Sequence, residues 1–216
     1  MKFHRAFQTQ SNFYIFLEYC DVGDLSSFIK ERHLRRTASA SSSKTHILFE
    51  HEASYVVRDI VRGLAHLQLV CKVMHRDIKL DNILVKRKNA NQGKSDKFSL
   101  PIDCYEFKLG DLGLAKNMTR ESQLHETICG TPLNMAPEVL KGDLYDLKAD
   151  VWSLGTVLFQ MLTGEYPFGG RDYEDLKANI GLGIYKVPKH VQVSPSCLDF
   201  LNSCLRFKSD KRKSWD

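Results

Sequence analysis

The chain contains the stretch Val73-Met74-His75-Arg76-Asp77-Ile78-Lys79-Leu80-Asp81-Asn82-Ile83-Leu84. It places an aspartate, a lysine and an asparagine in one short loop that is followed by an apolar strand. These side chains meet the needs of phosphoryl transfer: a carboxylate to orient and deprotonate the attacking hydroxyl, a cation beside the phosphate, and an oxygen ligand for magnesium. Aspartate and asparagine are also common in ordinary loops, so the interpretation depends on the spacing and on the motifs that follow.

The second informative stretch is Phe107-Lys108-Leu109-Gly110-Asp111-Leu112-Gly113-Leu114-Ala115-Lys116. Here an apolar strand runs into Asp-x-Gly, in which the carboxylate can bind magnesium and the glycine permits a sharp turn. Alone, Asp-x-Gly usually marks an ordinary turn. Its position after the first stretch makes it informative.

Three further motifs follow in order. They are Gly130-Thr131-Pro132-Leu133-Asn134-Met135-Ala136-Pro137-Glu138, then Asp150-Val151-Trp152-Ser153-Leu154-Gly155, then Lys208-Ser209-Asp210-Lys211-Arg212. The whole series resembles the eukaryotic serine/threonine protein kinases over essentially the entire chain. It matches H-R-D-x-K-x-x-N, then D-F-G with Leu112 in place of phenylalanine, then G-T-P-x-x-x-A-P-E. The last motif resembles N-P-x-x-R, with Ser209 in place of proline.

The resemblance implies an ATP-dependent transferase that uses Mg²⁺ and phosphorylates serine and threonine hydroxyls of proteins. The implied catalytic residues are Asp77, Lys79 and Asn82; the implied ATP-binding residues are Glu18, Cys20, Asp24, Lys79, Asn82 and Asp111; and the implied metal ligands are Asn82 and Asp111. The backbone of Glu18 and Cys20 would meet the adenine, and Asp24 the ribose or a basic substrate side chain. Two simpler alternatives stay open: Lys79 as a solvated loop residue and Asp24 as a helix N-cap.

The resemblance also implies regulatory and structural roles. Arg76 and Lys116 are expected to converge on a phosphate carried by Thr127 in the activation segment, and Thr131 to help define the seat of the acceptor hydroxyl. Glu138 is expected to pair with Arg212, and Asp150 to brace the backbone of the catalytic loop. Phe16-Leu17-Glu18-Tyr19-Cys20-Asp21-Val22-Gly23-Asp24-Leu25 and the segment around Thr131 are similar to the autophagy-initiating kinases.

The implied fold class is α+β: a protein-kinase-like fold with a mainly helical C-lobe, a few short strands and a remnant of the N-lobe sheet. Residues 1–20 are expected to form the end of the N-lobe and the hinge, and residues 21–216 the C-lobe, with surface insertions near 33–50 and 86–104. A strand is predicted over 13–20, and helices over 24–32, 52–69, 147–163, 173–180 and 195–206.

Three parts of a kinase are not found in the sequence: a glycine-rich phosphate loop, a strand lysine and its helix glutamate. The only G-x-G, Gly181-Leu182-Gly183, lacks a third glycine and a preceding strand. We expect these parts to lie upstream of Met1, and we expect the 216-residue chain by itself to be poorly active. The competing class is a non-catalytic, kinase-like interaction protein.

Composition agrees with one domain, because a chain of 216 residues that is 43% hydrophobic can bury a sizeable core. The net charge of +5 lies largely in the two insertions, which we interpret as mobile solvated loops and not as a nucleic-acid site, because no aromatic residues are interleaved. The longest apolar run is too short for a membrane span. Scattered cysteines without C-x-x-C spacing favour reduced thiols and a cytoplasmic protein.

Overall fold

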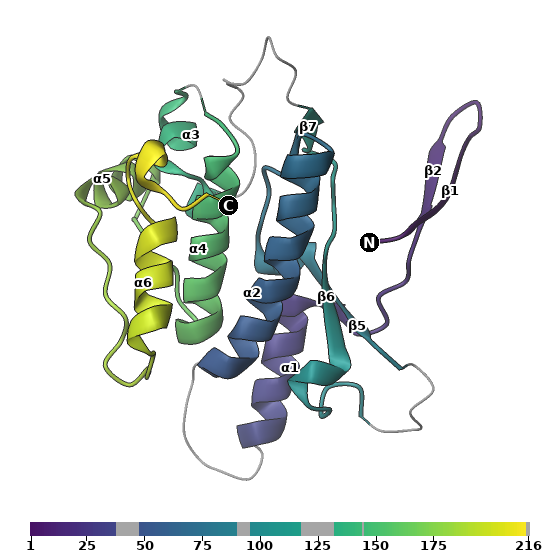
Figure 1. The fold of residues 1–216 in the computed structure, drawn as a ribbon, viewed down its shortest axis with the longest axis horizontal. Helices are drawn as coiled ribbons and strands as arrows, with labels where there is room; N and C mark the ends of the chain where they lie inside the picture. Colours follow the sequence, from purple (N-terminus) through teal and green to yellow (C-terminus); the bar gives the residue numbers. More distant parts are fainter. Residues whose placement is uncertain (38–47, 90–95, 118–131, 144, 215–216) are drawn as a thin grey trace.

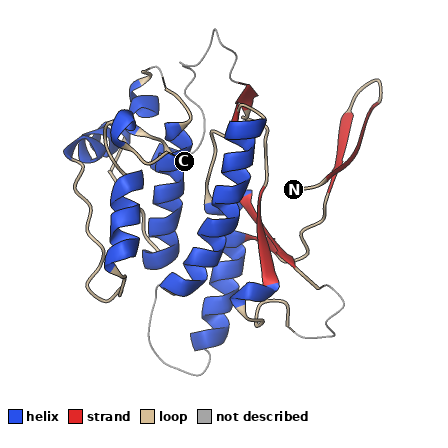
Figure 2. Cartoon of the chain, in the orientation of Figure 1, coloured by secondary structure: helices blue, strands red, loops and turns tan. Residues whose placement is uncertain are grey.

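A computed structural model describes residues 1–37, 48–89, 96–117, 132–143 and 145–214. Its elements are β1 (Phe3–Gln8), β2 (Phe13–Leu17), β3 (Gly23–Asp24), α1 (Leu25–Thr37), α2 (Glu50–Ala65), β4 (Val73–Met74), β5 (Ile83–Arg87), β6 (Tyr105–Leu109), β7 (Lys116–Asn117), α3 (Pro137–Lys141), α4 (Lys148–Thr163), α5 (Tyr173–Leu182) and α6 (Pro195–Cys204). The described chain is therefore mainly helical with short strands, as expected (Figure 2).

The strands form three small antiparallel sheets. β1 pairs with β2 as a hairpin, β5 lies between β3 and β6, and β4 pairs with β7. Figure 1 shows the hairpin projecting away from the helices, beside β5 and β6. Its apolar side chains are largely exposed, with Phe13 at 64% and Phe3 at 59%. The hairpin therefore adds little to the buried core of the described residues.

The core forms where α2, α4 and α6 pack together and where α2 covers β6. α4 is buried on nearly every side, and its Trp152 is 1% exposed. In α2 the apolar residues recur at helical spacing, so Val56, Ile60 and Leu64 all face inward with no more than 1% exposure. Central placement of α4 gives the molecule a rigid frame on which loops are fixed.

The helices end where the local sequence dictates. α3 begins at Pro137, which needs no amide partner, and ends at Gly142 with a φ of 73°. α5 begins after Asp172, whose carboxylate accepts from the backbone N–H of Asp175 at 2.9 Å. The predicted helices over 52–69, 147–163, 173–180 and 195–206 agree with α2 and its continuing π-helical turn His66–Val70, and with α4, α5 and α6.

One predicted helix boundary was wrong, and the insertions predicted near 33–50 and 86–104 are described only in part. The helix predicted over 24–32 continues to Thr37, because Arg32 and His33 are buried and hold its last turns against the body. The basic segment near 86–104 begins inside β5, and its residues 96–104 do not project as a solvated loop. There Arg32 donates to the carbonyl oxygens of Phe98 and Leu100 at 3.0 and 2.7 Å. Across the described residues we find no helix long and apolar enough to cross a lipid bilayer.

Arg32 fixes this part of the fold, which a substitution can test. It also pairs with Glu52 at 2.8 Å, and the two side chains are only 9% and 3% exposed. Arg32→Ala leaves Glu52 with Arg36 as its remaining cation and also removes the donor to the Phe98 and Leu100 carbonyls, so it should lower the free energy of unfolding by about 3 kcal/mol in urea titrations.

Arg35→Ala on the same helix is the matched control. The Arg35 side chain is 36% exposed and pairs with the similarly exposed Glu31 and Asp96, so its loss should lower the free energy of unfolding much less than the loss of Arg32 does. Equal losses in the two variants would show that Arg32 does not have this anchoring role.

Candidate active site

The predicted catalytic loop, residues 75–82, follows β4 and ends in a 3₁₀ turn at Leu80–Asn82. Asn82 Nδ2 donates to the carbonyl oxygen and to Oδ2 of Asp77, both at 2.8 Å. Lys79 Nζ lies 2.8 Å from the same Oδ2. Asp77 and Asn82 are nearly buried, at 9% and 8% exposure. The three residues predicted to be catalytic therefore lie in direct contact.

The charge on Lys79 is secured by its neighbours. Its hydrogen bond to Asp77 is the main cause that raises the pKa of Lys79, and attraction to Asp81 and Asp111 adds to it. The lysine is therefore a cation at neutral pH, beside the carboxylate that would receive a proton. This arrangement disfavours the alternative in which Lys79 is a solvated loop residue.

A buried carboxylate holds the loop from below. Asp150 of α4 is 1% exposed and accepts the backbone N–H groups of His75 and Arg76, each at 2.9 Å. Gln68 Nε2 donates to it as well, at 3.0 Å. Burial raises the pKa of Asp150, and the hydrogen bonds oppose that effect. Asp150 thus lies where the sequence analysis expected a brace.

The brace holds an uncommon backbone conformation. Arg76 has a φ of 69°, in the left-handed region that a non-glycine residue enters at a cost. Its side chain donates through Nε to the carbonyl oxygen of Leu114 at 2.5 Å, and the hydroxyl of Tyr145 lies 3.5 Å from one of its terminal nitrogens. This strained conformation lies directly before Asp77. It is held in place because Asp150 binds the backbone N–H groups of both His75 and Arg76.

The Asp-x-Gly turn is tied directly to the catalytic loop. Gly110 N–H donates to the carbonyl oxygen of Asn82 at 2.8 Å, and the Gly110 carbonyl lies 2.9 Å from His75 Nε2. Because a carbonyl can only accept, Nε2 of the fully buried His75 ring carries the proton. Asp111 has a φ of 53° and accepts the Gly113 N–H at 3.0 Å. The two predicted metal ligands are thereby held on adjoining backbone segments.

The last two residues of the turn lie in different surroundings: Gly113 has no room for a side chain, whereas the side chain of Leu112 is exposed. A Cβ at position 113 would lie 2.9 Å from Asp111 Oδ1, so only glycine fits without a shift. Leu112, which stands in place of the phenylalanine of D-F-G, is 53% exposed and lines an open cavity of about 1060 Å³ between the hairpin and the body.

The donor set fits magnesium. Both hydrogens of the Asn82 amide are engaged by Asp77, which leaves the amide oxygen for a cation. Asp111 offers an exposed carboxylate of which one oxygen is oriented by Gly113. Amide and carboxylate oxygens are the hard ligands that this ion prefers.

The predicted adenine-binding residues lie between β2 and β3. Glu18 donates its backbone N–H to the carbonyl of Lys2 at 2.8 Å. Its carboxylate is bound by Lys86 at 2.7 Å and by Lys108 at 2.9 Å. These two lysines lower the pKa of Glu18 to about 2. Burial raises the pKa of the nearby Cys20 thiol, so it is not a reactive thiolate.

Asp24 caps a helix. Its carboxylate accepts the backbone N–H of Ser27 at 2.7 Å and the Ser27 hydroxyl at 2.9 Å, the geometry of an N-cap at the start of α1. The simpler of the two alternatives for Asp24 is thus supported by direct contacts, and contact with a ribose stays a prediction.

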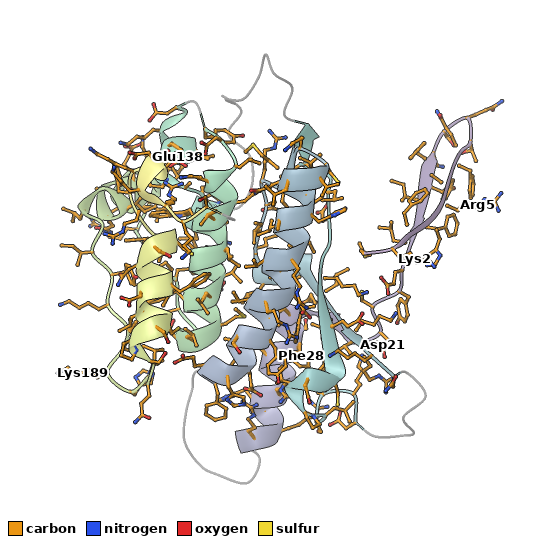
Figure 3. The ribbon with its side chains drawn as sticks, in the orientation of Figure 1. Lys2, Arg5, Asp21, Phe28, Glu138 and Lys189 are labelled. Carbon is orange, nitrogen blue, oxygen red and sulfur yellow. The ribbon has the colours of Figure 1, made fainter. Side chains whose placement is uncertain are left out.

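The predicted activation segment is described only at its edges. Thr127 and Thr131 lie outside the described residues. The backbone of Lys116 pairs with Met74 across β4 and β7, which brings it close to the strand that leads into Arg76. Past the segment, Arg212 binds both carboxylate oxygens of Glu138, at 2.5 and 2.6 Å (Figure 3 labels Glu138). The Arg212 side chain is completely buried.

Some residues that build the site were missed from the sequence. His75 stands inside the quoted motif, so its place two residues before Asp77 could have suggested a role. Gln68 carries no such signal, because it meets Asp150 across 82 residues of chain. Lys86 was assigned to a solvated basic insertion, although it binds Glu18.

The loops, their brace and the paired turn define the class of protein. The chain matches the protein kinase domain over residues 1–216, and it belongs to that family. The expected α+β protein-kinase fold is thereby confirmed.

Among curated proteins the chain is similar to serine/threonine-protein kinase ATG1a of Arabidopsis thaliana, with 35% identity over 95% of this chain and 29% of that protein. It is also similar to serine/threonine-protein kinase atg1 of Dictyostelium discoideum, with 34% identity over 94% of this chain and 26% of the relative. The inactive serine/threonine-protein kinase PLK5 of Mus musculus shares 32% identity over 99% of this chain and 31% of its own length. The expected relationship to the autophagy-initiating kinase group is confirmed, and the chain spans less than a third of each of these relatives.

The ion cluster at Glu18 predicts a pH dependence. The pKa of Glu18 is about 2 in the fold against an ordinary 4.5, so the carboxylate adds stability above pH 4.5 that is lost as pH falls toward 2. Glu18→Gln should therefore lower the melting temperature at pH 7, and the difference from wild type should shrink below about pH 4.5.

Thermal melts between pH 7 and pH 3 would measure this difference. Glu174→Gln is the matched control, because Glu174 is 80% exposed and its loss should change the melting temperature little at any pH. A Glu18→Gln effect of constant size across the range would contradict the assignment.

Proposed function

We propose that the protein is an ATP-dependent serine/threonine kinase that transfers the γ-phosphate of ATP to serine and threonine hydroxyls of protein substrates. The observation that carries the proposal is the contact of Asp77 with both Lys79 and Asn82, on a loop bonded to the Asp-x-Gly turn through Gly110. An ordinary loop has no reason to bury an aspartate against a lysine and an asparagine amide.

In the proposed mechanism Asp77 orients the attacking hydroxyl and accepts its proton. Lys79 stabilises negative charge on the phosphoryl group in flight, and its raised pKa keeps it cationic at neutral pH. The Asn82 amide oxygen and the Asp111 carboxylate would hold magnesium, which neutralises charge on the phosphates when it is bound. The rate enhancement would come from positioning and electrostatics.

The adenine would lie against the backbone of Glu18 and Cys20, which stands between β2 and β3. We propose a preference for serine and threonine over tyrosine, which rests on the Thr131 motif and on the serine/threonine kinases among the relatives. A cytoplasmic location and a part in autophagy are proposed on the same relatives, and the five described cysteines are free thiols, as a reducing compartment requires.

Substitution of Asp77 tests the reaction. In the full-length protein, Asp77→Asn should lower kcat by about a thousandfold, within the range seen for loss of a catalytic base and its positioning. Phosphate transfer to a serine peptide would be the measurement, with a matched tyrosine peptide that should be a poor acceptor.

Asp81→Asn is the control for charge, since Asp81 is exposed in the same loop. It should keep kcat within about twofold of wild type, as is usual for surface sites. Equal activity of wild type and Asp77→Asn would refute the mechanism.

One observation favours a second candidate, a non-catalytic interaction protein. A relative named as inactive matches 99% of this chain, and the 216-residue sequence contains no G-x-G-x-x-G. We propose that residues 1–216 alone transfer phosphate slowly, because their sequence lacks the glycine-rich loop that covers the phosphates in kinases. Titration of the full-length protein with MgATP separates the candidates: an interaction protein would show no saturable binding.

Phosphorylation of Thr127 is proposed as the activating event. In support, the Arg76 side chain already binds the carbonyl oxygen of Leu114, which precedes Thr127 in the chain. Thr127→Ala should lower kcat of the full-length protein by about tenfold, the scale of one to three lost charge-assisted bonds.

Thr119→Ala, in the same segment, should have little effect. Mass spectrometry would report phosphate at Thr127 in the active wild type. Full activity of Thr127→Ala, with no phosphate at that position, would remove this proposal.

A further inference from the structure

The linker, residues 18–22, joins the hairpin to the body of the molecule (Figure 3 labels Asp21 on it). It contains the two backbone positions proposed to meet adenine, Glu18 and Cys20. The side chains of Glu18 and Asp21 bind three cations on β5 and β6: Lys86, Arg87 and Lys108. A fourth cation, Lys97 from the segment between these strands, donates to the backbone carbonyl of Asp21.

Each end of the linker has its own anchor. At the first end, the Glu18 carboxylate accepts hydrogen bonds from the Lys86 and Lys108 side chains and from the backbone N–H of Lys2. The Glu18 side chain is only 13% exposed. Lys108 is 19% exposed, so this contact is shielded from solvent and from screening by salt.

At the other end, Asp21 accepts Arg87 Nε at 2.6 Å and the Arg87 backbone N–H at 3.0 Å. Lys97 Nζ donates to the Asp21 carbonyl at 3.1 Å. The next residue, Val22, donates its backbone N–H to the carbonyl oxygen of Val85 in β5 at 3.2 Å. The linker is thus held at both ends and not only where it enters β3.

The strands that contain Lys86, Arg87 and Lys108 also border the predicted metal ligands. β5 begins directly after Asn82, and β6 ends two residues before Asp111. The two strands pair along their whole lengths, from Ile83 opposite Leu109 to Arg87 opposite Tyr105. A cation on these strands therefore has a fixed separation from Asn82 and Asp111.

We propose that Lys86 and Lys108 are positioning residues for nucleotide binding: they hold Glu18 so that the adenine-binding backbone keeps a set distance from the metal ligands. The inference rests on the proposed kinase function. Neither lysine touches the reacting atoms, so they act on how well the adenine end of ATP is bound and not on the chemical step.

The test uses the full-length protein with Lys86→Gln, Lys108→Gln and the double variant. The double variant should raise Kd for MgATP and for adenosine by the same factor, about fivefold or more, and raise KM for ATP to match, with kcat within about twofold. Affinity for magnesium tripolyphosphate should not change. Lys108→Arg, which keeps the cation, should stay within about twofold of wild type.

Two controls separate this role from a purely structural one. Lys177→Gln removes an exposed ion pair on α5 and should alter neither KM nor the melting temperature appreciably. Lys86 is 32% exposed, so Lys86→Gln keeps the test open even if Lys108→Gln folds poorly.

The outcomes are distinct. If the wild type binds MgATP and the double variant binds it equally well, this inference is wrong and the kinase proposal stands. A fall in kcat with unchanged KM would also overturn the positioning role, since it would place the lysines in support of the catalytic loop. If the wild type binds no MgATP, both proposals fail.

Discussion

The buried carboxylate of Asp150 joins α4 to two segments that lie more than seventy residues earlier in the chain. It meets Gln68 in the π-helical turn that follows α2, and the amides of His75 and Arg76. Taking a carboxylate out of water is costly, and it is offset only when several donors surround the charge. Those donors are also the parts of the chain that must be fixed for Asp77 to be placed. The same bonds therefore satisfy a buried charge and define the loop.

The rest of the site extends this frame along short, paired strands. Gly110 is held from one side by Asn82 and from the other by His75, so the Asp-x-Gly turn cannot move independently of the catalytic loop. From these two segments β5 and β6 run as a hydrogen-bonded pair toward the linker. There the contact is made by side chains, because Lys86 and Lys108 bind Glu18. Functional groups on rigid elements are held more closely than groups on free loops.

Local patterns allowed much of this to be predicted from the sequence. The contact of Asp77 with Asn82 follows from residues five apart in one loop, and the buried face of α2 follows from helical periodicity. The pairing of Glu138 with Arg212 was expected from the family resemblance, although 74 residues separate the two.

Other features depended on contacts with no local signal. Lys86 and Lys97 could not be told from solvated charges, because their partners in the linker lie 68 and 76 residues away. Arg32 extends α1 for the same kind of reason: its partners Phe98 and Leu100 belong to a segment that looked like a loop. Charge in a sequence identifies a group that seeks a partner, and only the fold identifies which partner.

The closing contact between Arg212 and Glu138 has a consequence for the order in which the chain matures. Besides Glu138, Arg212 donates to the carbonyl oxygens of Lys148, Arg206 and Phe207, so it joins α3, the start of α4 and the end of the chain. A ribosome needs roughly 4 to 15 s to add the 74 residues between the two partners, at about 5 to 20 residues per second. During that time Glu138 has been synthesised without its cation. The helical lobe can therefore reach its final packing only after translation has passed Arg212, and the nascent chain is exposed to chaperones and proteases until then.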